Sequence, residues 1–278
     1  MESRLTKPLK KIFIYFILIT LSVICLIPFF WMLSTSLKTK TTMWQIPIQW
    51  IPNPVKWSNY SDAFSYAPML RYIMNTLIIE LFTILGQVIS CTLIAYGFAR
   101  FRFRGREVLF MIMLGTMLIP EQVTMIPMFM LFSKIHWINT YLPLIVPQFF
   151  GNAFFVFLMR QYLLTIPKDL DEAAKIDGAN SIQILFKILI PVLKPSITII
   201  VVFTFTNVWN NFMGPLIYLN DPSKFTLAVG LANFISSRGS EWNLFMAAAT
   251  VALIPLLVIY YFAQRNLIGG IASMGIKG

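Results

Sequence analysis

Six long apolar runs, separated by polar connections, dominate the sequence. They cover approximately Ile12–Leu33, Tyr72–Ala99, Val108–Leu131, Tyr141–Leu164, Ser196–Leu219 and Leu244–Ala263. Crossing about 30 Å of hydrocarbon takes roughly 20 helical residues, so each run is long enough to span a membrane. The pattern predicts an all-α polytopic membrane protein with six transmembrane helices in a single transmembrane domain, residues 1–278. The first run is too long for a signal peptide and no small-x-small cleavage site follows it, so we expect it to be retained.

The composition supports this class of protein and excludes several others. Hydrophobic residues make up 58% of the 278 positions and charged residues only 12%, against about 25% charged residues in soluble domains. Such a chain has too few charges to cover a soluble domain of this size and too many apolar residues to be disordered. Cys25 and Cys91 both lie inside apolar runs, and His136 is the only histidine. We therefore expect no disulfide scaffold and no metal site.

The net charge of +11 is explained by orientation in the membrane rather than by a nucleic-acid partner. If the N-terminus is cytoplasmic, about two thirds of the 22 lysines and arginines fall on that side. They lie in the N-terminal segment, the second and fourth connections and the C-terminal tail. The distribution predicts that both termini are cytoplasmic.

The fourth connection, residues 165–195, carries more helix signals than a simple loop needs. Asp169 is a candidate N-cap, and Asp171 and Glu172 place negative charge in a first helical turn, where the helix dipole favours it. Ala173 and Ala174 follow as small helix formers that would let another surface approach closely. These signals predict a short helix with a small, acidic, exposed surface.

A second short helix is predicted immediately after the first. Gly178 is placed to end the first helix in a left-handed conformation. Asn180 or Ser181 then caps a helix over Ile182–Ile190, which Pro191 should close. This second helix is apolar at Ile184, Leu185, Ile188 and Leu189, so we expect it to pack beneath the transmembrane bundle.

This connection resembles the EAA motif, E-A-A-x3-G-x9-I-x-L-P, of binding-protein-dependent ABC importer permeases. The residues that match in register are Glu172, Ala173, Ala174, Gly178, Ile188 and Pro191. Ile190 replaces the usual leucine. The run Asp177-Gly178-Ala179 resembles the carbohydrate-type subgroup. Over nearly its whole length the chain is similar to the maltose-type second permease subunit.

The resemblance implies an ABC type I importer permease fold in a bacterial or archaeal cell membrane. It implies three kinds of partner besides membrane lipids: a second homologous permease subunit, a dimer of ATPase subunits and an extracytoplasmic solute-binding protein. In this family the motif helix docks on the ATPase and passes on its closure. In this chain the coupling segment would be residues 165–195. The residues that would take the coupling role are Asp171, Glu172, Ala173, Ala174, Asp177, Gly178 and Ala179.

The chain itself lacks the means to use ATP. It contains no G-x4-G-K-[ST] sequence that could cradle phosphates, and no nucleophile–base set argues for an enzyme. We therefore expect no catalytic residue and no bound cofactor. ATP and Mg would be bound by the separate ATPase chain.

Polar residues inside the apolar runs are candidates for lining a transport pathway. Glu80 and Glu121 are costly there unless they find a partner, water or a proton, so interhelical pairing and a proton relay are alternatives for both. Asn207, Asn210 and Asn211 are spaced i, i+3 and i+4 and would share one stripe of a helix. They would border a cavity or join helices, while Gly214-Pro215 could interrupt that helix.

The sequence thus predicts a permease subunit of an ATP-driven importer for a sugar or oligosaccharide. It would form half of the pathway and couple to a separate ATPase. One alternative is the same kind of importer for glycerol-3-phosphate or another polyol-like solute. An anionic solute would favour lysine or arginine in the pathway, and the last four apolar runs hold none at their centres. The other alternative is a proton-coupled secondary transporter that uses Glu80 or Glu121.

Overall fold

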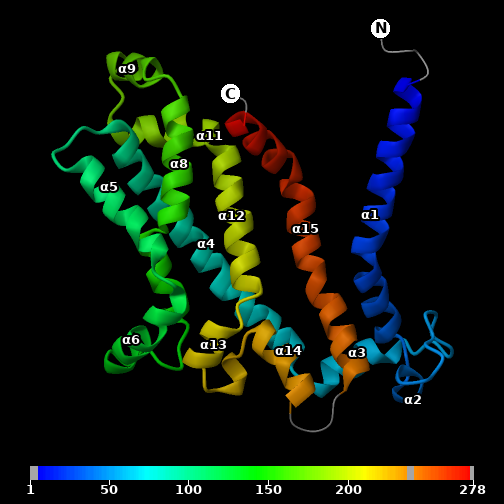
Figure 1. Cartoon of the computed structure of the whole chain (residues 1–278). Coiled ribbons are helices and arrows are strands. Elements are labelled where there is room, and N and C mark those ends of the chain that lie inside the picture. Colours follow the sequence, from blue (N-terminus) through cyan, green and yellow to red (C-terminus); the bar gives the residue numbers. More distant parts are fainter. Residues whose placement is uncertain (1–5, 237–240, 276–278) are drawn as a thin grey trace. The chain divides into compact units, whose positions relative to one another are not determined.

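The structure is a computed structural model that describes residues 6–236 and 241–275 of the chain. Every regular element in these residues is a helix, and they contain no strand, so the predicted all-α class is confirmed (Figure 1). The helices of ten or more residues are α1 (Thr6–Ser36), α4 (Met69–Arg100), α5 (Arg106–Gly115), α6 (Glu121–Lys134), α8 (Ala153–Thr165), α12 (Lys194–Trp209), α14 (Leu227–Ser236) and α15 (Trp242–Gly275).

Shorter helical pieces connect them. They are α2 (Lys40–Met43), α3 (Ser58–Tyr66), η1 (Thr116–Leu118), α7 (Leu142–Ile145), η2 (Val146–Phe150), α9 (Asp169–Ile176), α10 (Ser181–Gln183), η3 (Ile184–Leu189), α11 (Ile190–Val192), α13 (Met213–Tyr218) and η4 (Pro222–Lys224). Several of them come directly before or after a long helix, so apolar runs that look continuous in the sequence are built from more than one piece.

Four helical segments of the described chain are long and apolar enough to cross a membrane. They are Lys10–Ser36, Met69–Arg100, Leu142–Thr165 and Trp242–Gln264. Two bent pairs also qualify: Arg106–Leu118 with Glu121–Lys134, bent by 98°, and Ser181–Val192 with Lys194–Trp209, bent by 77°. The predicted six spans agree with the structure when each bent pair is counted as one.

The third predicted span, Val108–Leu131, is wrong as one continuous helix. It breaks at Ile119-Pro120, both of which adopt extended conformations, and a new helix begins at Glu121. Proline disfavours a helical conformation in the residue before it and has no N–H to continue the hydrogen-bond ladder. Glu121 therefore lies at the start of α6 rather than in the middle of a span.

The fifth predicted span, Ser196–Leu219, is also divided, and the break is not at Gly214-Pro215. Helix α12 ends at Trp209, and α13 begins at Met213. The side-chain Oδ1 of Asn211 accepts the backbone N–H of Gly214 at 3.1 Å, which offers the backbone an alternative to a continued helix. Pro215 is tolerated because it lies in the first turn of α13, where an N–H has no helical partner to lose.

The chain divides into two compact units, and we describe each by itself. The first comprises Met1–Met69 and Leu231–Ile254. Its centre is Asn59, which is fully buried and donates from Nδ2 to the carbonyl oxygens of Ser36 and Lys38 at 2.8 Å each. Asn243 donates to Asn59 Oδ1 at 3.1 Å, and Lys40 forms an ion pair with Glu241. These contacts join the end of α1 to the start of α15. The single domain over 1–278 stays a prediction.

The second unit comprises Leu70–Gly230 and Pro255–Gly278. Its core joins the C-terminal half of α4 to α8 and to the connection that follows α8. Small residues of α4, such as Ala95 and Ala99, pack with Met159 and Leu163 of α8 and with Leu189 of η3, and all five are buried. Small side chains let helices approach closely inside a membrane. The core therefore places the candidate coupling segment directly against a transmembrane helix.

We predict that Gly230 is required for the packing of α14 on α4. A Cβ atom at Gly230 would come within 2.1 Å of Tyr72 Cδ2, whereas a Cβ at Gly97 would meet no atom within 4 Å. Gly230→Ala should therefore destabilise the purified protein by about 1–3 kcal/mol through overpacking. The matched Gly97→Ala should be neutral or stabilising, because alanine favours a helix. Thermal unfolding in detergent measures both, and equal melting temperatures would contradict the prediction.

Candidate functional site

The connection 165–195 contains the two short helices that the sequence predicts. Helix α9 covers Asp169–Ile176 and carries Asp169, Asp171 and Glu172 in its first turn. The capping position falls on Lys168, with no side-chain cap, so the predicted N-cap role of Asp169 is wrong. Asp169 is instead the first helical residue, where its negative charge still complements the helix dipole.

Helix α9 ends in a left-handed turn at Gly178, as predicted. Gly178 has a φ of 81°. Its N–H donates to the Lys175 carbonyl at 3.0 Å, and the Ala179 N–H donates to the Ala174 carbonyl at 2.9 Å. This is the Schellman arrangement, which satisfies the last carbonyls of a helix and favours glycine at the left-handed position. The glycine turns the chain directly into the second short helix.

The second helix begins as predicted but continues further. Asn180 and Gln183 form a reciprocal capping box, with two hydrogen bonds of 2.9 Å. The prediction that Pro191 closes the helix is wrong, because helical structure continues to Val192. A π-helical turn, η3, directly precedes the last helical piece, α11, which contains Pro191. Such a turn changes the pattern of backbone hydrogen bonds, so the missing N–H of Pro191 is tolerated. Ile184, Leu185 and Leu189 are buried, which confirms the expected packing.

A buried ion pair fixes the connection 165–195 to α4. Arg100, the last residue of α4, places Nε 2.7 Å from Asp171 Oδ2, and their side chains are only 5% and 10% exposed. Arg100 Nη2 also donates to the Ile166 carbonyl at 3.1 Å. One turn earlier, the hydroxyl of Tyr96 donates to the Ser181 carbonyl at 3.2 Å. The end of α4 therefore holds the beginnings of both short helices.

The two faces of α9 differ in accessibility. Glu172, Ala173, Asp177 and Gly178 are exposed, and Ala179 is half-buried. Asp171 and Ala174 are buried, so the expectation that they belong to an exposed surface is wrong. They lie three residues apart and share the inner face of the helix, where Asp171 meets Arg100 and Ala174 joins the apolar core.

Large apolar side chains are exposed on the same segment. Ile176, Ile182 and Phe186 are 87%, 69% and 57% exposed. Ile176 is the last residue of α9, and Ile182 and Phe186 belong to the second short helix. Exposed apolar side chains grouped on a short segment are typical of a surface that another protein covers.

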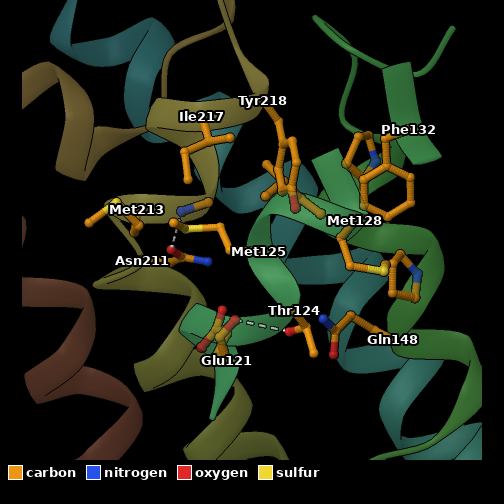
Figure 2. A pocket seen from close by; sticks show the side chains of 14 residues that line it. Glu121, Thr124, Met125, Met128, Phe132, Gln148, Asn211, Met213, Ile217 and Tyr218 are labelled. Carbon is orange, nitrogen blue, oxygen red and sulfur yellow. Dashed lines mark hydrogen bonds between the residues drawn. The ribbon is translucent and has the colours of Figure 1, made fainter. Parts of the chain in front are cut away.

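A pocket of about 180 Å³ lies between the bent helices of the second unit (Figure 2). Its polar lining residues are Glu121, Thr124, Gln148, Asn211 and Tyr218, and the others are apolar or glycine, with three methionines among them. Glu121 and Thr124 come from α6, Gln148 from η2, and Asn211 from the break between α12 and α13. Irregular backbone at membrane depth is tolerated where it lines a cavity, which agrees with this arrangement.

The amides that line the pocket are held by their neighbours. Gln148 Oε1 accepts a hydrogen bond from Gln87 Nε2 of α4, and Asn211 Oδ1 accepts the Gly214 N–H. Thr124 Oγ1 donates to the Glu121 carbonyl at 2.9 Å. The amide donors of Gln148 and Asn211 and the carboxylate of Glu121 are the groups left to meet a solute.

The structure brings only two of the five candidate pathway residues into the pocket, Glu121 and Asn211. Asn207 is exposed on α12, and Asn210 is exposed directly after its last residue. Asn210 Nδ2 donates to the Thr206 carbonyl at 2.8 Å. Glu80 is 3% exposed on α4 and does not line the pocket. Within the described residues its carboxylate oxygens have no hydrogen-bond partner.

The sequence reasoning missed two sets of residues. Gln87 and Gln148 are amides inside apolar runs, which is the signal that identified the asparagines and that could have identified them too. Arg100 was recognised only as one of many basic residues in a cytoplasmic connection. Its pairing with Asp171 depends on packing between distant segments, which no local pattern signals.

The helical spans and the bent helices are those of an integral membrane protein. The model of the family described as "Binding-protein-dependent transport system inner membrane component" matches residues 91–272, so the chain belongs to this family. Two solved structures share the fold. One is a bacterial ABC transporter involved in the import of the acidic polysaccharide alginate, with a TM-score of 0.83 and 24% identity over 96% of this chain and 99% of that one. The other is a bacterial alginate ABC transporter in complex with an alginate-bound periplasmic protein, with a TM-score of 0.66 and 17% identity over 95% and 96%.

Sequence relatives cover nearly the whole chain. The arabinooligosaccharides transport system permease protein AraQ of Bacillus subtilis (strain 168) is 32% identical over 93% of this chain and 92% of its own length. The galactooligosaccharides transport system permease protein GanQ of the same organism is 32% identical over 100% of this chain and 99% of its own length. The melibiose/raffinose/stachyose import permease protein MelC, also of that organism, is 32% identical over 91% of each chain. The chain is therefore a multi-pass membrane permease of the ABC importer class.

We predict that the Arg100–Asp171 pair is essential for the stability of the coupling segment. Asp171→Ala would leave a buried guanidinium without its counter-charge, which costs about 3–5 kcal/mol. Glu172→Ala, in the same helical turn but exposed, should change stability by about 0.5 kcal/mol or less. Thermal unfolding of the purified protein compares the two variants. In a double-mutant cycle, the stability lost in the Asp171→Ala/Arg100→Ala double variant should be smaller than the sum of the losses in the two single variants. Losses that simply add would show that the two side chains do not interact.

Proposed function

We propose that this chain is one of two permease subunits of an ATP-driven importer for an oligosaccharide. The observation that carries the proposal is the presentation of α9. Its outer face offers Glu172 and Ala173, and its inner face is tied to α4 through Asp171 and Arg100. An external protein that moves α9 would therefore move a transmembrane helix of 32 residues.

Energy would come from a separate ATPase dimer that binds ATP and Mg, while this chain binds no cofactor. Asp171, Ala174 and Ala179 would set the position of α9, and Glu172, Ala173, Asp177 and Gly178 would meet the ATPase. The exposed Ile176, Ile182 and Phe186 support a protein partner at this surface, because apolar side chains so exposed gain from being covered. Closure of the ATPases would be transmitted along α4 and reopen the pathway to the opposite side of the membrane.

An oligosaccharide as cargo is supported by the names of the relatives and by the chemistry of the pocket. The relatives carry arabino- and galactooligosaccharides and melibiose, raffinose and stachyose in their names. Amide and hydroxyl groups suit sugar hydroxyls, and aromatic rings suit the C–H face of a sugar. Asn211, Gln148 and Tyr218 supply these groups. The proton-coupled alternative, which would use Glu80 or Glu121, has no support from the names of the relatives.

The proposal places the protein in a bacterial or archaeal cell membrane with both termini cytoplasmic. A second homologous permease subunit would complete the pathway, and an extracytoplasmic solute-binding protein would deliver the sugar. The test of this function is the purified complex in proteoliposomes. Uptake of a neutral oligosaccharide should require ATP and the binding protein and should persist when the proton gradient is collapsed. Uptake that depends on the proton gradient would overturn the proposal.

Coupling makes a specific prediction about Gly178. Gly178→Val should abolish most of the binding-protein-stimulated ATPase activity of the complex, because valine strongly disfavours a positive φ. Gly105, in another connection, is a matched control. Its φ is 82°, close to the 81° of Gly178, and a Cβ atom at either glycine would meet no atom within 4 Å. Gly105→Val should carry a similar strain and leave stimulation largely intact. Glu172→Lys should lower stimulation without loss of thermal stability, and wild-type stimulation in both Gly178→Val and Glu172→Lys would refute the coupling role.

The orientation of the chain makes a prediction that labelling can test. In a background without Cys25 and Cys91, Ser58→Cys on α3 should react with a membrane-impermeant thiol reagent in intact cells. Arg104→Cys, also exposed, should react only after the cells are permeabilised. The opposite result would reverse the orientation inferred from the basic residues.

A further inference from the structure

The pocket in the second unit has an uneven distribution of charge. Glu121 is its one acidic lining residue, and no lysine, arginine or histidine of the described chain lines it. The Glu121 side chain is exposed, and the described residues provide it with no ion-pair partner. Figure 2 shows it at the edge of the pocket opposite Tyr218, on the same side as Asn211. An unpaired carboxylate at a pocket with few competing charges gives the pocket a negative potential.

The helix start at which Glu121 lies reinforces this charge pattern. The free N–H groups at a helix N-terminus form a ready site for anions, and interrupted membrane helices often point such ends at anionic solutes. Here the interruption at Ile119-Pro120 exposes the start of α6, but Glu121 is its first residue. The chain therefore places a carboxylate of its own in the first turn of α6, where its charge opposes an anionic solute.

We propose that Glu121 sorts solutes by charge, so that the pocket admits uncharged oligosaccharides and excludes anionic ones such as those built from uronic acids. This inference rests on the proposed function and narrows its substrate class. The neutral amides of Gln148 and Asn211 bind hydroxyls of any sugar, whereas Glu121 opposes a carboxylate, sulfonate or phosphate. No lysine, arginine or histidine of the described residues lines the pocket to offset this repulsion.

The decisive test measures charge selectivity at the pocket itself. Thr124, which lines the pocket one turn after Glu121, is replaced by cysteine in a complex without Cys25 and Cys91. The rates of modification by a cationic and an anionic methanethiosulfonate of similar size are then compared. We expect the cationic reagent to be preferred. Glu121→Gln should lower the cation-to-anion rate ratio by roughly tenfold, and Glu121→Lys should invert the preference.

A matched control removes a carboxylate elsewhere in the same unit. Glu107, at the start of α5, pairs with Arg106 and Arg160 and does not line the pocket. Glu107→Gln should leave the rate ratio at Thr124→Cys unchanged. An unchanged ratio in both Glu121 variants, or an equal change in Glu107→Gln, would overturn the inference.

Uptake of a neutral trisaccharide separates this inference from the proposed function. In the Glu121→Gln complex the ratio of anionic to neutral trisaccharide uptake should rise by roughly tenfold, because the carboxylate that opposes anionic solutes is gone. Lost neutral uptake with an unchanged reagent ratio would make Glu121 a sugar contact and refute a sorting role. Failure of the wild-type complex to import any neutral oligosaccharide would refute the proposed function, whatever the reagent ratio.

Discussion

The position of the connection 165–195 depends on one buried ion pair. Arg100 ends the longest helix of the second unit, and Asp171 lies in the first turn of α9, so their contact joins the two elements at their termini. The position suits both charges, because the C-terminus of α4 favours a cation and the N-terminus of α9 favours an anion. Burial makes the pair sensitive to the loss of either partner, and it also restricts α9 to one orientation. The outer face that carries Glu172 and Ala173 follows from that orientation.

Proline and asparagine shape the interior of the membrane region in different ways. Ile119-Pro120 stops a helix because proline removes an N–H and forces its predecessor into an extended conformation. Asn210 and Asn211 end α12, and the Asn211 side chain bonds to the backbone at the start of α13. Both breaks contribute lining residues to the same pocket. The interruptions therefore create a polar site where continuous helices would present only apolar side chains.

Much of the architecture was predictable because a membrane constrains a chain strongly. Backbone groups in lipid must bond within their own segment, so a long apolar run implies a helix. The left-handed turn at Gly178 and the cap at Asn180 were predictable because they depend on residues a few positions apart. The breaks in the third and fifth spans were not placed correctly, since a hydrophobic run does not reveal whether its backbone bends. Pro191 was wrongly predicted to end the second short helix for a related reason. The sequence does not reveal the π-helical turn that accommodates the proline.

By itself the sequence determined the helical class, the apolar spans and the short motif helices, because each follows from local periodicity and capping. It also determined the family, through the spacing of Glu172, Gly178 and Pro191. Only the tertiary structure decided that Asp171 faces inward to Arg100 and that Glu121 and Asn211 line the same pocket, while Asn207, Asn210 and Glu80 do not. Such pairings join residues far apart in the sequence. They depend on how whole helices pack against one another, and a local pattern carries no record of that packing.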